Sequence, residues 1–198
     1  KYRLMKDFIF VHIPKAGGIS IVEALNLSTQ DCYHRKPSSY SEKQLRDSFK
    51  FSFTRNPWSR VVSAYFFLIG GGLNKDDELF GNFLKSLGGF NEFLTYLCND
   101  IPVNYINSRG HNHTCIDEWL HFQPQTKRLD RPMDFIGKNE NLQEDFNHVC
   151  AQIQHPIVSI NQSNRSNHKF YQDYYNDVCK KLVSKKYQSD IDTYEYLF

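Results

Sequence analysis

The sequence predicts an α/β fold of three layers, with a central parallel sheet flanked by helices. An apolar run at 8–13 leads through a glycine-bearing turn into an amphipathic helix, and a second run at 49–54 leads into another helix. A third stretch of the same kind covers 133–153. Alternating strands and helices are typical of parallel sheets. The 198 residues suffice for a sizeable core, so we expect one domain spanning residues 1–198.

The first strand is the run Phe8-Ile9-Phe10-Val11-His12-Ile13, whose β-branched and aromatic residues are typical of a buried parallel strand. Pro14 ends it, because proline has no N–H for the sheet ladder. We interpret His12 as a structural residue within this strand.

The turn after this strand has the composition of an anion site. Gly17 and Gly18 allow a sharp bend and a close approach of backbone to ligand. Ser20 is expected to open a helix with an apolar face, so that free N–H groups and the helix dipole point at the ligand. Lys15 adds a mobile positive charge. A plain strand-to-helix turn with a surface lysine is the alternative.

The second strand–helix stretch places a cation at the same edge of the sheet. Arg55 follows the predicted strand 49–54, Pro57 suits the first turn of the next helix, and Ser63 falls on its second turn. The arginine fork can bind two phosphate oxygens. Because ligands of parallel sheets bind beyond the carboxyl ends of strands, we expect both motifs to share one crevice.

Both motifs resemble those of a known family. Pro-Lys-x-Gly-Gly-x-Ser after a strand resembles the 5′-phosphosulfate loop of sulfotransferases that use 3′-phosphoadenosine 5′-phosphosulfate (PAPS). Arg-x7-Ser resembles their 3′-phosphate site. The chain is most similar to the carbohydrate branch, which includes heparan 2-O enzymes and bacterial relatives, and the stretch 134–142 also matches it.

The resemblance implies a P-loop-like three-layer fold and PAPS as co-substrate. It assigns the 5′-phosphosulfate to a loop of six residues: Lys15, Ala16, Gly17, Gly18, Ile19 and Ser20. It assigns the 3′-phosphate to Arg55 and Ser63. A later loop that closes over the nucleotide would contribute Asn161, Ser163 and Arg165.

The implied reaction moves a sulfuryl group in line to an acceptor hydroxyl on a carbohydrate, with Lys15 stabilising the leaving phosphate. The hydroxyl needs a general base. His34 lies between the two motifs, where glycan sulfotransferases of this kind keep a catalytic histidine. His121, in a His-Phe-Gln-Pro-Gln stretch that resembles a site-lining loop, is the rival, and Glu23 is a weaker third.

Two other functions remain open. A nucleotide kinase or NTPase could use a similar sheet, but Lys15 precedes the glycines, unlike the lysine of a Walker A loop. A non-catalytic module that binds nucleotide or glycan could retain the pocket without the base.

Composition excludes several partners. A net charge of +2 predicts no nucleic-acid partner, and no apolar run reaches the ~18 residues of a membrane span. His111, His113 and Cys115 alternate, but without a fourth ligand we expect no metal. A set of basic residues either faces an anionic acceptor or is solvated surface charge: Arg109, Lys127, Arg128 and Arg131.

The five cysteines form no Cys-x-x-Cys pair, and one bridge, Cys98 to Cys115, stays open. Low cysteine content slightly favours the bacterial cytoplasm over the Golgi lumen. Because the sequence starts at Lys1, a lost N-terminal anchor also stays open.

Periodicity and turn residues predict the remaining elements: helices at 41–46, 78–87, 90–98 and 142–153, a fourth strand at 156–160, loops at 28–41 and 99–114, and a helical end at 169–198.

Overall fold

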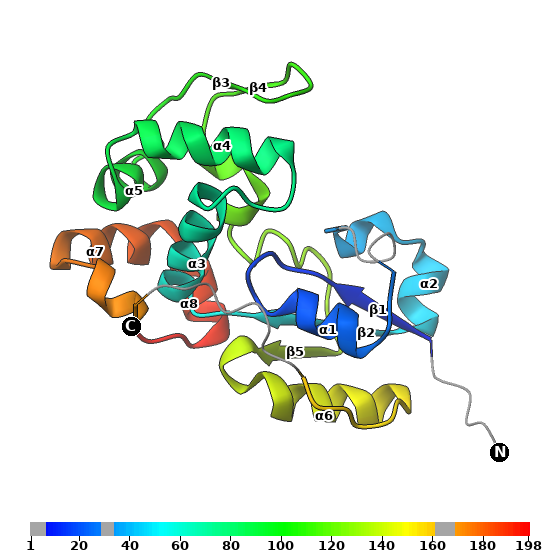
Figure 1. Ribbon diagram of the computed structural model, residues 1–198. Coiled ribbons are helices and arrows are strands. Elements are labelled where there is room, and N and C mark those ends of the chain that lie inside the picture. Colours follow the sequence, from blue (N-terminus) through cyan, green and yellow to red (C-terminus); the bar gives the residue numbers. More distant parts are fainter. Residues whose placement is uncertain (1–6, 29–33, 161–168) are drawn as a thin grey trace. The chain divides into compact units, whose positions relative to one another are not determined.

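The computed structural model describes residues 7–28, 34–160 and 169–198 and divides into two compact units (Figure 1). The first unit consists of the described parts of Lys1–Arg55 and Gln125–Arg165. The second consists of the described parts of Asn56–Pro124 and Ser166–Phe198. The chain therefore leaves the first unit after Arg55 and returns to it at Gln125.

The first unit contains a parallel sheet of three strands in the order β1–β2–β5: β1 (Phe8–Val11), β2 (Phe49–Thr54) and β5 (Phe135–Lys138). A pair of polar residues fixes the register of the last strand. Lys50 donates its backbone N–H and its Nζ to Asp134 Oδ2, each at 2.7 Å, and Asp134 N–H donates to the Lys50 carbonyl at 2.8 Å. This central sheet confirms the predicted parallel topology.

Helices flank this sheet, as Figure 1 shows for α1 (Gly18–Ala24) and α6 (Leu142–Ile153). Apolar side chains of both helices form one buried cluster with the phenylalanines of β1 and β2. The short helix α2 (Glu42–Asp47) begins at Ser41, whose hydroxyl and Gln44 form a capping box. The mixed α/β architecture predicted from the sequence is confirmed.

The predicted fourth strand at 156–160 is wrong. These residues are extended but join no sheet, and the Ile157 side chain is 68% exposed. The Gln143 side chain supplies their hydrogen bonds instead: its Oε1 accepts from Ile160 N–H (2.7 Å), and its Nε2 donates to the Val158 carbonyl (3.1 Å). A side-chain amide on α6 thus replaces the neighbouring strand that the β-branched composition had suggested.

The second unit is mainly helical, with α3 (Pro57–Ile69), α4 (Lys75–Ser86), α5 (Phe90–Cys98), α7 (Asp177–Lys186) and α8 (Gln188–Tyr194). Its core is rich in aromatic residues. A hairpin of β3 (Tyr105–Ile106) and β4 (Asn112–His113) occupies the stretch expected to be a loop. Short 3-10 turns complete the unit, including Ile116–Glu118, Leu120–Phe122 and Tyr171–Tyr174.

The second unit differs from the sequence prediction at the start of α4, and it decides whether Cys98 and Cys115 form a bridge. The helix predicted at 78–87 begins earlier, at Lys75, because Asn74 caps it by accepting from Asp77 N–H (3.0 Å). Cys98 and Cys115 are both free thiols, so the bridge left open between them is not formed. Within the described ranges, no helix has the length and apolar character needed to cross a bilayer.

Candidate active site

The loop after β1 begins and ends two residues earlier than the sequence predicted. The strand ends at Val11, so His12 lies outside it, and α1 begins at Gly18 rather than at Ser20. Lys15 and Gly17 both have positive φ, +66° and +84°. A Cβ at Gly17 would also lie 2.8 Å from Asn139 Oδ1, so glycine is required there for conformation and for space.

Gly18 has a second, unforeseen role. A Cβ at this position would lie 2.0 Å from the His12 ring, so the missing side chain makes room for the imidazole. Sequence patterns gave no signal of this contact, because it joins two segments that local periodicity treats separately. The side chains of Ala16 and Ser20 are buried in the same loop.

Arg55 lies against this loop. Its Nη1 donates to the Lys15 carbonyl at 3.3 Å. The buried Gln125 side chain holds the arginine backbone on the other side: Gln125 Oε1 accepts from Arg55 N–H, and Gln125 Nε2 donates to the Arg55 carbonyl, both at 2.9 Å. The structure thus brings the Arg55 guanidinium against the backbone of the turn that contains Lys15, at the carboxyl ends of β1 and β2.

His34 also belongs to this cluster. Its Nδ1 lies 2.8 Å from the His12 carbonyl, and the two imidazole centroids are 4.4 Å apart. A carbonyl oxygen can only accept, so Nδ1 carries the proton, and Nε2 of the neutral ring carries the lone pair. His12, interpreted from sequence as structural, therefore helps to fix the tautomer of the predicted base.

Two predicted residues, Ser63 and His121, lie in the second unit. Ser63 is buried on the second turn of α3, where the sequence placed it. The His121 ring stacks on Phe67 at 5.3 Å, and its carbonyl accepts from Arg60 Nη1 at 3.0 Å. Their roles in the 3′-phosphate site and as rival base stay predictions.

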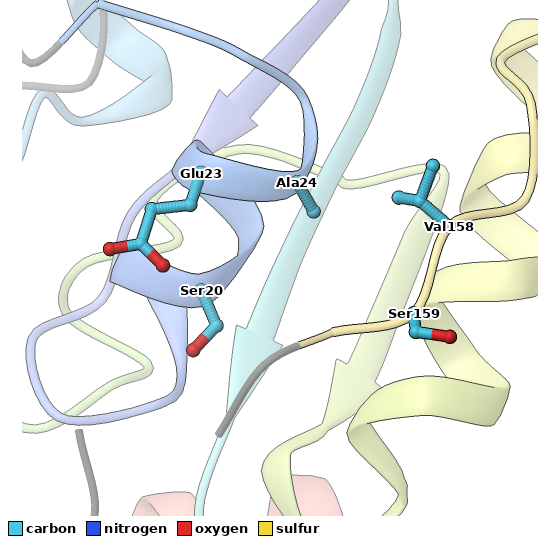
Figure 2. Close-up of a pocket in the computed structure, with 5 residues that line it drawn as sticks. All are labelled: Ser20, Glu23, Ala24, Val158 and Ser159. Atoms are coloured by element: carbon cyan, nitrogen blue, oxygen red, sulfur yellow. The ribbon is translucent and has the colours of Figure 1, made fainter. Parts of the chain in front are cut away.

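A pocket of about 250 Å³ adjoins the loop, lined by Ser20, Glu23 and Ala24 of α1 and by Val158 and Ser159 of the extended segment (Figure 2). Figure 2 shows Ser20 and Glu23 projecting from the helix and Val158 from the facing chain. Typical small-molecule pockets measure about 300–1,000 Å³. This pocket lies just below that range.

The basic residues and possible metal ligands singled out in the sequence lie in different environments. Arg128 is buried, which excludes the solvated-surface alternative for this residue, whereas Arg109 is exposed beside Asp76. His113 Nδ1 lies 3.3 Å from Glu118 Oε2. No group of three or more metal-ligating side chains occurs within 7–28, 34–160 and 169–198. Asn161, Ser163 and Arg165 lie outside the described residues.

Comparison with protein-family models matches residues 5–197 to the model described as "Sulfotransferase family". A search of curated proteins found no match. The family match includes both sequence motifs and nearly the whole chain.

Proposed function

The chain belongs to the sulfotransferase family, and we propose that it moves a sulfuryl group from PAPS to a hydroxyl of a carbohydrate acceptor. It is thus a transferase of the EC 2.8.2 type. The observation that carries the PAPS assignment is the hydrogen bond from Arg55 Nη1 to the Lys15 carbonyl. It supports one bisphosphate site formed by two distant motifs. The carbohydrate acceptor rests on the resemblance described above.

In this proposal the loop Lys15–Ser20 holds the 5′-phosphosulfate, and Arg55 with Ser63 holds the 3′-phosphate. The donor set suits an anion, because it combines an ammonium, a guanidinium, a buried hydroxyl and the N–H groups of a glycine-bearing turn. Asn161, Ser163 and Arg165 would complete the nucleotide site.

The reaction is an in-line displacement. The acceptor oxygen forms a bond to sulfur while the bond from sulfur to the 5′-phosphate oxygen breaks, and 3′-phosphoadenosine 5′-phosphate leaves. Lys15 stabilises the negative charge that grows on this phosphate. The hydroxyl proton passes to the general base.

We assign the base to His34 rather than to His121. The hydrogen bond between His34 Nδ1 and the His12 carbonyl favours the tautomer whose Nε2 can accept a proton. His34 also belongs to the same unit as Lys15 and Arg55.

The first test is calorimetric titration with 3′-phosphoadenosine 5′-phosphate in the presence of EDTA, with ATP as the control. We expect tight binding of the bisphosphate and weaker binding of ATP. A preference for Mg-ATP would favour a kinase-like enzyme. Binding of the bisphosphate without turnover of PAPS on desulfated heparan, chondroitin or other glycans would favour a non-catalytic module.

Substitution of the two cations tests their separate roles. Lys15→Ala should abolish transfer with little loss of stability. Arg55→Gln should weaken bisphosphate binding about 10- to 100-fold, as expected for loss of a charge-assisted hydrogen bond. Full activity of the Lys15 variant, or unchanged affinity of the Arg55 variant, would remove that residue from its proposed role.

A further inference from the structure

The turn at 125–130 contacts both halves of the proposed site. It begins at Gln125, whose side chain pairs with the backbone N–H and carbonyl of Arg55. The Gln125 carbonyl in turn accepts from the N–H groups of Arg128 (2.9 Å) and Leu129 (3.2 Å). Any displacement of this turn would therefore act directly on the backbone of Arg55.

The same turn holds the segment that carries His34. Arg128 Nη2 donates to the His34 carbonyl. Four residues further along, Ser38 donates its N–H to Asp130 Oδ1 (3.0 Å) and its hydroxyl to Asp130 Oδ2 (2.6 Å). Two contacts from one turn thus fix both ends of the segment 34–38.

Arg128 is an unusual residue to hold the backbone of another segment, because it is a buried cation. It is only 6% exposed, its Nε has no hydrogen-bond partner, and no ion pair joins it to a carboxylate within the described part of the chain. Burial lowers the pKa of its guanidinium, an effect that the charge of Asp130 only partly opposes. Among the described residues, Arg128 is therefore held through the His34 carbonyl rather than through a carboxylate. Because its guanidinium is buried, loss of that hydrogen bond would be costly.

We propose that Arg128 is a positioning residue that holds the His34 backbone, so that the turn 125–130 supports the general base through Arg128 and the nucleotide-binding arginine separately through Gln125. This inference rests on the proposed function, since it takes Arg55 and His34 in the roles assigned above. Arg128 acts through the His34 carbonyl, which fixes where the imidazole stands relative to the His12 carbonyl. Arg128 itself needs no contact with PAPS or with the carbohydrate acceptor.

The contacts of Arg128 predict that its substitution lowers kcat but leaves bisphosphate affinity unchanged. In Arg128→Gln, we expect kcat to fall about 10- to 100-fold, because a small misplacement of a base costs that much. Bisphosphate affinity should stay within about twofold, because Gln125 still holds Arg55. Arg46→Gln, which removes an exposed arginine from α2 in the same unit, is the matched control and should leave both quantities unchanged.

A double-mutant cycle distinguishes positioning from a merely structural role. Kinetics would be measured as release of 3′-phosphoadenosine 5′-phosphate from PAPS, with desulfated heparan as acceptor. If Arg128 acts through His34, Arg128→Gln should have no further effect on kcat in a His34→Gln background. Additive losses, an unchanged kcat, or a loss of bisphosphate affinity that matches the loss of kcat/KM would overturn the proposal.

Nitrogen NMR of the His34 ring, assigned with His34→Gln, tests the positioning without any acceptor. We expect the Nδ1-protonated tautomer in the native chain and a shift toward the Nε2-protonated form in Arg128→Gln. Arg128→Lys, with one shorter donor, should shift it part of the way and serves if the glutamine variant does not fold. An unchanged ring signal in the folded variants would contradict the inference. Failure of bisphosphate binding by the native chain would instead contradict the proposed function.

Discussion

At the scale of single residues, the close contact between Gly18 and the His12 ring leaves no room for a side chain. Gly18→Ala would place a methyl group 2.0 Å from that ring, so the imidazole must move. We expect a loss of about 1–3 kcal/mol in the free energy of unfolding, as for other overpacked sites, measured by urea denaturation. The φ of Gly18 is not positive, so the cost is purely steric. It should largely vanish in a His12→Ala background, and persistence there would show that another contact is responsible.

Burial at this scale could not be predicted from the sequence. Arg128 and Lys127 are neighbours with similar chemistry, yet one is buried and the other exposed. The difference arises because Arg128 meets the carbonyl of His34, 94 positions earlier in the chain. Motif spacing located Lys15 and Arg55 correctly at strand ends, because that placement depends only on local sequence.

At the scale of elements, strand–turn–helix units were predictable because each carries its own periodicity and caps. The hairpin of β3 and β4, in a stretch expected to be a loop, is one exception. The segment 156–160 is another, because its composition indicates a strand, whereas the Gln143 side chain supplies its hydrogen bonds. Gln143→Ala should therefore speed hydrogen exchange at the Ile160 amide about fivefold, as expected for the loss of one hydrogen bond worth roughly 1 kcal/mol. Asn147→Ala removes only the Asn147 Oδ1 acceptor and leaves the bonds of Gln143 to Val158 and Ile160 in place. In that control, the Ile160 amide should exchange at the native rate.

At the scale of the whole molecule, binding of the bisphosphate tests whether Ser63 of α3 belongs to the 3′-phosphate site that the sequence motif proposes. Bisphosphate at 100 times its Kd should stabilise the chain by about 2.7 kcal/mol. Hydrogen exchange should then slow in the loop 14–18 and also in α3. Ser63→Ala should reduce the protection of α3 and weaken affinity, while leaving the loop protected. Slower exchange in the first unit alone would exclude Ser63 from the 3′-phosphate site.

The strand order also has a consequence for synthesis on the ribosome. The middle strand β2 obtains its second neighbour late, since Lys50 meets Asp134 84 positions further along. Until residues 56–138 have been translated, that side of β2 offers unpaired N–H and C=O groups to other chains. Nascent chains that stop before β5 are therefore the species most prone to aggregate, and slow translation through the second unit lengthens the period of risk.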